Sequence, residues 1–157
     1  MESAFLEAEK AYEKKEIPIG AVIVYQNRII AKSHNLVQTL KDPTAHAEIL
    51  AITSACANLD SKFLSEATMY VTLEPCTMCF GALVLSRLKK IVIGTSDPKT
   101  GACGGKLDLA SSNLYNHKIE IEKGVLEAKC SGILKEFFRN LRIEKSKQNE
   151  NLEINLN

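Results

Sequence analysis

Short runs of β-branched residues alternate with helix-like segments along most of this 157-residue chain. Apolar residues recur at helical spacing in residues 3–15, 43–57, 75–87 and 125–142. Strand-like runs cover residues 19–35, 67–73, 89–94 and a stretch from residue 118, and polar residues 26–28 divide the first run into a hairpin. We therefore expect an α/β protein, a three-layer α/β/α sandwich on a five-stranded mixed sheet. Its first two strands are antiparallel and its later strands parallel.

Two connections in this pattern contain cap and turn residues. Asp42 followed by Pro43 predicts the N-cap and the first position of the second helix. Residues 95–117 form a long connection with Gly101, Gly104 and Gly105 among polar residues. Long connections without regular structure often belong to binding sites, so we expect this one to border the site.

The composition is that of one globular domain. With 45% hydrophobic and 25% charged residues, a chain of this length can form a single core without disulfides. We expect this domain over residues 1–145. Residues 146–157 are polar, with too few apolar side chains to pack, and we expect them to be a disordered C-terminal tail.

The ends and the net charge exclude several classes of protein. The first 15 residues carry acids and lack an apolar core, which is not the pattern of a signal peptide, and no run of about 18 apolar residues predicts a membrane span. We therefore expect a cytoplasmic protein without a membrane partner. A formal net charge of +1 excludes binding to nucleic acid by bulk charge alone, so any RNA binding requires local basic patches.

Of the five cysteines, two have the spacing of a motif. An odd number of cysteines in a chain without a secretory signal indicates reduced thiols. Cys56 and Cys130 lie in apolar helical patterns and are expected to be small buried side chains, and Cys103 is a loop thiol without an assigned role. Cys76 and Cys79, three residues apart at a predicted helix start, can bind one metal ion.

His46 and Glu48 complete this constellation. The positive end of a helix dipole favours the thiolates that zinc requires, so His46, Cys76 and Cys79 are predicted to bind Zn²⁺. Three protein ligands leave a fourth position for water, which is typical of catalytic zinc. Glu48 lies about 200° around the helix from His46, so it is predicted to carry protons for that water rather than to bind the ion.

A closed, structural zinc site is the alternative. Its fourth ligand would be Cys103, His34 or His117, and Glu48 would then be an acid favoured by the helix dipole. The catalytic interpretation ranks higher because the closed site leaves both the Pro-Cys pairing and the His-x-Glu spacing unexplained.

H-x-E followed by P-C-x-x-C resembles the signature of zinc-dependent nucleoside and nucleobase deaminases. More narrowly, the chain from residue 18 to residue 142 resembles bacterial tRNA-specific adenosine deaminases. The segments that carry this resemblance are PIGAVIV (18–24), HN (34–35), DPTAHAEI (42–49), YVTLEPCTMC (70–79), DPKTGACGG (97–105), NH (116–117) and FFRNLR (137–142).

The resemblance implies a homodimer with the deaminase fold that converts the wobble adenosine of a tRNA anticodon loop to inosine. One zinc ion per chain would lower the pKa of its water from about 15.7 toward 7. Glu48 would take a proton from the water that attacks C6, protonate N1, and then supply a proton to the departing ammonia. No DNA substrate is expected.

The resemblance also implies which residues contact the RNA. Asn35 would hold the flipped base, with backbone groups of Ala47 and Pro75 nearby, although Asn35 also suits a turn after the second strand. The positions that would line the anticodon-loop site are Asp97, Lys99, Asn116, His117, Phe138, Arg139 and Arg142. Phe80 departs from the family pattern, in which a small residue commonly follows the second cysteine, and would narrow or reshape the pocket.

Two rival functions share these residues. Guanine, cytosine and deoxycytidylate deaminases have the same zinc ligands, and only pocket contacts select the base. A zinc-stabilised RNA-binding module without turnover belongs to another class, but binding alone does not require the carboxylate of Glu48.

Overall fold

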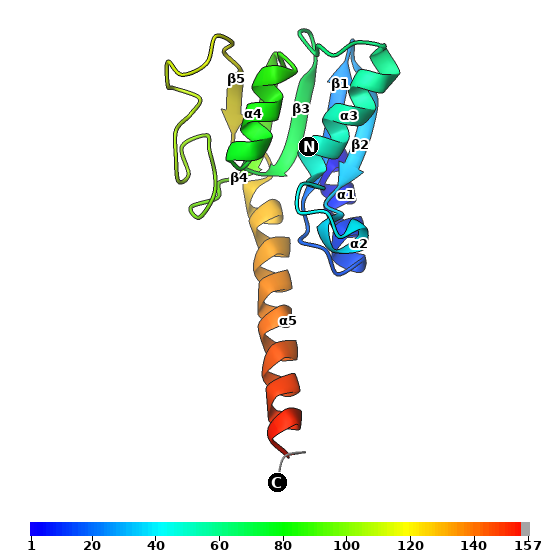
Figure 1. Cartoon of the computed structure of the whole chain (residues 1–157), viewed down its shortest axis with the longest axis vertical. Helices are drawn as coiled ribbons and strands as arrows, with labels where there is room; N and C mark the ends of the chain where they lie inside the picture. The colour runs from blue at the N-terminus through cyan, green and yellow to red at the C-terminus, as the bar shows by residue number, and fades with distance from the viewer. Residues whose placement is uncertain (155–157) are drawn as a thin grey trace.

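A computed structural model describes residues 1–154, with the side chains of residues 1–148 (Figure 1). In chain order, the elements are α1 (Glu2–Glu13), β1 (Gly20–Tyr25), β2 (Arg28–His34), α2 (Val37–Leu40), α3 (Ala47–Leu59), β3 (Thr68–Leu73), α4 (Thr77–Leu85), β4 (Lys90–Thr95), β5 (Glu120–Lys123) and α5 (Glu127–Ile154).

The five strands form one mixed sheet in the order β2-β1-β3-β4-β5. Strand β1 pairs antiparallel with both β2 and β3, whereas β3 with β4 and β4 with β5 pair in parallel. Because β2 therefore runs in the same direction as β3, the ends of β2, β3 and β4 lie at one edge of the sheet. This is the mixed sheet that the sequence predicts.

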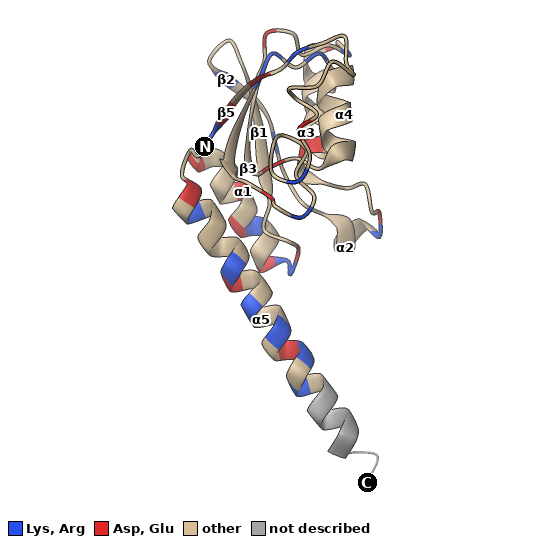
Figure 2. Ribbon diagram, turned by 90° about the vertical axis from the view of Figure 1, so that its left-hand side faces the viewer, with Lys and Arg blue, Asp and Glu red and all other residues tan. Residues whose placement is uncertain are grey.

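Helices cover both faces of the sheet. Helices α3 and α4 lie on one face, and α1 and the first part of α5 on the other (Figures 1 and 2). The core between the sheet and the α3–α4 layer includes Ile23, Met69, Val71, Leu83 and Ile93, all fully buried. The predicted three-layer α/β/α sandwich is confirmed. No helix within the described residues is both long and apolar enough to cross a membrane.

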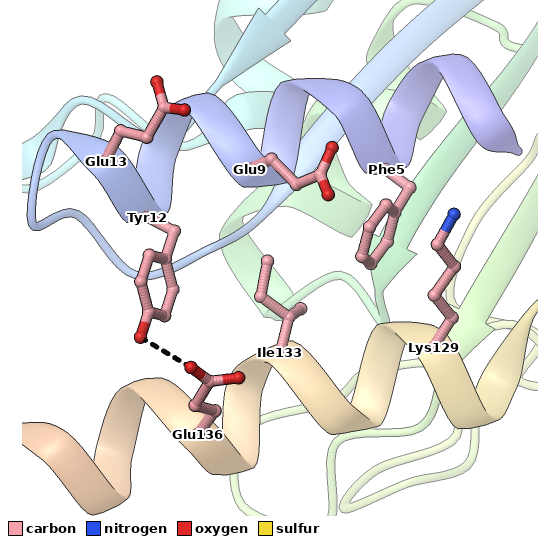
Figure 3. A pocket seen from close by; sticks show the side chains of 7 residues that line it. All are labelled: Phe5, Glu9, Tyr12, Glu13, Lys129, Ile133 and Glu136. Carbon is pink, nitrogen blue, oxygen red and sulfur yellow. Dashed lines mark hydrogen bonds between the residues drawn. The ribbon is translucent and has the colours of Figure 1, made fainter.

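Helix α5 is anchored against α1 along an open groove (Figure 3). The hydroxyl of Tyr12 donates to Oε1 of Glu136 at 3.1 Å, and its ring meets Phe137 edge to face at 5.8 Å between centroids. The Nζ atom of Lys129 lies 4.3 Å from the centre of the Phe5 ring. These contacts fix the first part of α5, and the rest of the helix projects beyond the sheet (Figure 2).

The projecting part of α5 is longer than the sequence pattern predicts. The expected helix ends near Arg142 and is followed by a disordered tail, but α5 continues to Ile154. Glu, Lys and Gln are good helix formers, so a helix that is already nucleated can extend through them without a packed face. Residues 155–157 of the predicted tail lie outside the described residues.

The start of α3 also differs from the prediction. Asp42 and Pro43 do not begin the helix; instead, Oδ1 of Asp42 accepts hydrogen bonds from the backbone and the hydroxyl of Thr44, both at 2.7 Å. This side chain therefore closes a turn, as Asp before Pro often does. The helix begins at Ala47, with His46 as its N-cap residue in an extended conformation.

Candidate functional site

The candidate site lies where α3 and α4 begin, at the edge of the sheet where β2, β3 and β4 end (Figure 1). His46 and Cys76 are the residues that immediately precede these two helices. Both have extended backbones, which point their side chains away from the helix axes and toward each other. The N-terminal ends of two helices thus bring these side chains to one point.

His46, Cys76 and Cys79 form a compact group of potential metal ligands. The Nδ1 atom of His46 lies 3.8 Å from Sγ of Cys76 and 3.5 Å from Sγ of Cys79. All three ligand atoms lie within 4.8 Å of one another. Nitrogen and sulfur ligands on a tetrahedral zinc ion, with bonds of about 2.0–2.1 and about 2.3 Å, are about 3.6 Å apart. The donor set and its spacing therefore fit zinc.

The electrostatics of the group also suit a cation. A hydrogen bond from the Cys79 thiol lowers the pKa of Cys76 to about 4. The same pairing, together with burial, raises the pKa of Cys79. The contact with Cys76 raises the pKa of His46. The lowered pKa favours a thiolate on Cys76, and the thiolate is the form in which cysteine binds a metal.

A closed metal site is not formed by the described side chains. Cys103, His34 and His117 do not join the His46–Cys76–Cys79 group in the part of the chain that the structure describes. His34 contacts Glu7 through Nδ1 at 3.0 Å and Lys14 through Nε2 at 3.0 Å, on the α1 side of β2. Among the described side chains the group thus offers three ligand atoms, the number that the catalytic interpretation predicts.

Glu48 is the buried carboxylate of this site. Its side chain is 3% exposed, and Oε2 has no hydrogen-bond partner among the residues that the structure describes. Burial raises its pKa, and it lies close enough to His46 and Cys76 to interact with them electrostatically. An unpaired buried carboxylate is costly, and carboxylates with perturbed pKa values cluster at functional sites, so Glu48 is the candidate proton carrier of this site.

Asn35, Ala47 and Pro75 lie at the same edge. Asn35 follows β2 and is buried, with its backbone N–H donating to the Ile19 carbonyl at 3.0 Å. The Ala47 carbonyl accepts a 2.7 Å hydrogen bond from the hydroxyl of Ser33, which ties the start of α3 to β2. The Pro75 carbonyl accepts from the backbone of Ala102 at 2.9 Å. The two carbonyls are held in place by the protein itself.

The loop of residues 97–105 lies against the Cys76 segment. Asp97 turns its carboxylate back onto the loop, where Oδ1 accepts from the backbone of Lys99 at 2.8 Å and Oδ2 from the hydroxyl of Thr100 at 2.6 Å. The Lys99 side chain is exposed. Asp97 therefore shapes the turn that presents Lys99.

Asn116 and His117 are not brought to the metal-ligand group. The Nε2 atom of His117 contacts the Leu88 carbonyl at 2.7 Å, beyond the C-terminal end of α4, whereas the cysteines lie at its N-terminal end. Asn116 is exposed beside it. Strand β5 runs parallel to β4, so the residues that precede β5 must lie at the opposite edge of the sheet from the site.

Phe80 does not narrow the site. Its side chain is buried in the core and meets Tyr115 edge to face at 5.7 Å between ring centroids. It follows Cys79 by one position, about 100° around α4, and this rotation directs the ring to the core when Cys79 faces the ligand group.

Phe138, Arg139 and Arg142 lie where α5 leaves α1, around Asn140, whose amide donates to the Tyr12 hydroxyl at 2.9 Å. Phe138 is 39% exposed, while Phe137 packs on Tyr12, so the structure makes Phe138 the outward ring of this pair. Both arginines are exposed. The helix extends past the edge of the sheet at which α3 and α4 begin (Figures 1 and 2).

Sequence reasoning missed two buried glutamates, of which Glu74 lies beside the site. Glu74 is 3% exposed and accepts three backbone hydrogen bonds from residues 97–105. Glu16 is fully buried and accepts from the backbones of Gln38 and Thr39 at the start of α2. The sequence does contain a signal for Glu74, which is an acidic residue directly between an apolar strand and Pro75. It contains no comparable signal for Glu16, which lies between a helix and Pro18.

Known deaminases resemble this chain over most of its length. A family model for MafB19-like deaminases matches residues 1–142. A tRNA-specific adenosine deaminase of Bacillus subtilis (strain 168) is 50% identical over 152 residues, which are 97% of this chain and 94% of that protein. A solved structure from studies of A-to-I editing by tRNA:A34 deaminases at the wobble position of transfer RNA has a TM-score of 0.83 at 42% identity, covering 85% of this chain and 97% of that one.

A rival deaminase is more distant. The structure of a guanine deaminase from Bacillus subtilis has a TM-score of 0.59 at 32% identity, covering 88% of this chain and 90% of that one. Both the identity and the structural agreement are lower than for the tRNA deaminases. The chain therefore belongs to the deaminase family, and within it to the tRNA-specific adenosine deaminases.

Proposed function

We propose that this protein is a zinc-dependent hydrolase that deaminates adenosine to inosine at the wobble position of tRNA anticodons. The observation that carries the proposal is the buried carboxylate of Glu48, with one oxygen unpaired, beside three ligand atoms that fit zinc. Similarity to tRNA-specific adenosine deaminases supports the choice of substrate. An RNA-binding module without turnover has no use for such a carboxylate.

His46, Cys76 and Cys79 would hold the zinc ion. When bound, zinc lowers the pKa of a coordinated water molecule toward about 7 and so supplies a nucleophile at neutral pH. Glu48 would take one proton from the attacking water and pass it to N1 of the adenine as the water oxygen bonds to C6. It would then move the remaining proton of that oxygen to the exocyclic nitrogen, so that the C6–N bond breaks, ammonia leaves and a carbonyl remains at C6.

Burial suits Glu48 to this double role. Because burial raises its pKa, the carboxyl group holds a proton more readily than an exposed glutamate does. A carboxyl group whose pKa lies closer to the working pH both takes and returns a proton efficiently. Oε2 of Glu48 has no hydrogen-bond partner among the described residues, so this oxygen is available to take and return the proton.

Three groups around the pocket would orient the base. We propose that Asn35 hydrogen-bonds the flipped adenine, with the backbones of Ala47 and Pro75 beside it. Their placement at the ends of β2 and β3 and at the start of α3 supports this assignment. The backbone carbonyls of Ala47 and Pro75 each accept a hydrogen bond from the protein, which holds this side of the pocket in place. Less conformational entropy is therefore lost when the base binds.

The RNA outside the pocket would contact two exposed surfaces. One is the turn that presents Lys99, shaped by Asp97; the other is the part of α5 with Phe138, Arg139 and Arg142. The arginines would hold phosphates, and the exposed ring would stack on an unpaired base. Asn116 and His117 do not enter this proposal, since they lie at the other edge of the sheet.

We further propose that the enzyme works as a homodimer in the cytoplasm, with residues 1–145 as its deaminase domain. Sedimentation at micromolar concentrations checks the dimer. A truncated chain without residues 146–157 that still folds and edits RNA would support the domain boundary.

The deciding experiment is incubation of the purified, zinc-loaded protein with a transcribed tRNA that carries a wobble adenosine, followed by detection of inosine. The same transcript with guanosine at that position is the substrate control. Free guanine, cytidine, deoxycytidylate and adenosine are tested in parallel. Inosine in the tRNA with little turnover of the free compounds supports the proposal; comparable turnover of a free base or nucleotide would favour a rival deaminase.

A further inference from the structure

We propose that Glu74 is a positioning residue whose buried carboxylate fixes the loop of residues 97–105 and so sets one wall of the substrate site. The inference rests on the proposed function, because the loop matters for catalysis only if it borders the tRNA. In this proposal Glu74 is neither one of the zinc ligands nor the residue that transfers protons.

The first observation is the hydrogen bonding of Glu74. Its Oε1 atom accepts from the backbone N–H groups of Cys103 at 2.7 Å and Gly105 at 2.9 Å, and its Oε2 atom accepts from that of Asp97 at 3.0 Å. All three donors belong to one loop. Because hydrogen bonds to a carboxylate are stronger than neutral ones, this side chain holds the loop at both of its ends.

The second observation is the space around the carboxylate. A Cβ atom on Gly101 would lie 2.5 Å from the Asp97 carbonyl oxygen and 2.6 Å from Cδ of Glu74, and one on Gly105 would lie closer still to that carbonyl oxygen and 2.5 Å from Oε2 of Glu74. Neither glycine has a left-handed backbone; in the described part of the chain, the glycines with positive φ are Gly104 and Gly124. These two positions therefore exclude side chains because the loop packs closely on the Glu74 carboxylate and on its own Asp97 carbonyl, not because of backbone conformation.

The third observation connects the loop to the metal-ligand group. Glu74 is two residues before Cys76, and between them the Pro75 carbonyl accepts from the backbone of Ala102. Cys76 and Gly101 also form an isolated antiparallel bridge. One carboxylate thus fixes the loop that presents Lys99 to the segment that supplies a metal ligand.

The change Glu74→Gln separates this role from size and shape. The amide is nearly isosteric with the carboxylate, but its NH₂ group places a donor opposite one of the three N–H donors. We expect the N–H groups of Asp97, Cys103 and Gly105 to exchange with solvent at least tenfold faster. Because a displacement of about 1 Å can cost about 10²-fold in rate, we expect kcat/KM for tRNA to fall by about 10–100-fold, mainly through KM.

The test is amide hydrogen exchange by NMR on the full, zinc-loaded chain, together with zinc content and steady-state kinetics. Thr72→Val is a matched control on the same strand, because its buried Oγ1 accepts the Gly20 N–H at 3.1 Å, away from the loop. It should lower stability without faster exchange in residues 97–105. Glu74→Gln should speed exchange there while zinc stays at one ion per chain.

Gly105→Ala provides a second route if Glu74→Gln does not fold. Its new methyl group should displace the loop from the carboxylate and speed exchange of the same amides. Gly132→Ala, where a Cβ would meet nothing within 4 Å, is its control and should change neither exchange nor KM. Faster exchange in both loop variants with a raised KM supports the proposal.

Unchanged exchange at these three amides in Glu74→Gln, or equal changes in Thr72→Val, would overturn it. So would faster exchange with an unchanged KM. If the wild-type protein edits no tRNA, the proposed function fails by itself, and the exchange data still decide whether Glu74 holds the loop.

Discussion

The Nδ1 atom of His46 lies 3.5 Å from Sγ of Cys79, although 33 residues separate the two in the chain. This distance matches the separation of nitrogen and sulfur ligands on one tetrahedral zinc ion. The contact joins the start of α3 to the first turn of α4, so metal binding and the packing of this layer should be coupled.

Removal of a ligand should therefore lower both metal content and stability. We expect Cys79→Ala to lose the one zinc ion per chain, as measured by elemental analysis. A ligand at 100 times its Kd stabilises a protein by about 2.7 kcal/mol, so the thermal midpoint in excess zinc should fall by about 5–11 °C. Cys56→Ala, a cysteine outside the group, should retain the ion. A metal-free enzyme with full activity would contradict the zinc assignment.

Glu48→Gln should separate proton transfer from metal binding. The glutamine keeps the shape of the side chain but cannot accept and return a proton, so turnover should fall by about 10²–10⁴-fold. Zinc content should remain at one ion per chain, and the unfolding midpoint should not fall, since the change removes a buried carboxylate with an unpaired oxygen. Loss of zinc in this variant would show that Glu48 is a ligand.

The buried carboxylate of Glu16 should make stability depend on pH. Burial raises the pKa of Glu16, but hydrogen bonds from the backbones of Thr39 and Gln38 outweigh it and leave the pKa below its usual value. A carboxylate with a lowered pKa in the folded state stabilises the fold above its unfolded pKa of about 4.3, and this stabilisation is lost as pH falls. Urea unfolding at pH 7 and pH 3 should show this loss, because pH 3 lies below the unfolded pKa, where the stabilisation disappears.

Glu16→Gln should reduce the difference in unfolding free energy between the two pH values. The matched control is Glu9→Gln, because Glu9 is exposed on α1. An equal pH dependence in the wild type and the Glu16 variant would contradict the assignment.

RNA binding should depend on the cations of α5. We expect the double variant Arg139→Ala/Arg142→Ala to weaken tRNA binding. The slope of log K against log salt should become shallower by about one unit for each phosphate that the variant no longer binds. Filter binding at several salt concentrations measures both quantities.

A matched control removes two cations at the other end of the molecule. Lys62 and Arg87 lie over the Phe63 ring, at 5.2 and 4.3 Å, and Lys62→Ala/Arg87→Ala should leave the salt dependence nearly unchanged. Deletion of residues 146–157 should weaken binding less than the removal of both α5 arginines. If the deletion abolishes editing while the arginine variant binds normally, the RNA surface lies elsewhere.

The sequence by itself determined the fold class and the metal-ligand group. Alternating helical and β-branched segments predict the layers, since side-chain periodicity is local. The His-x-Glu and Cys-x-x-Cys spacings predict the ligands for the same reason: residues a few positions apart on a helix end have a fixed relative placement. The parallel direction of β3 and β4 followed from the helix between them.

Tertiary structure decided what depends on residues far apart in the chain. The N-cap residue of α3 is His46 and not the predicted Asp42, because Asp42 closes a separate turn with Thr44. His117 was assigned to the site by resemblance, yet the parallel pairing of β5 places it beside Leu88 at the opposite edge. The Glu74 carboxylate accepts hydrogen bonds from three N–H groups that lie 23–31 residues away in the chain, and no local sequence pattern encodes such an arrangement. Burial of a carboxylate is a property of the packed chain, so only the fold shows which glutamates support the site.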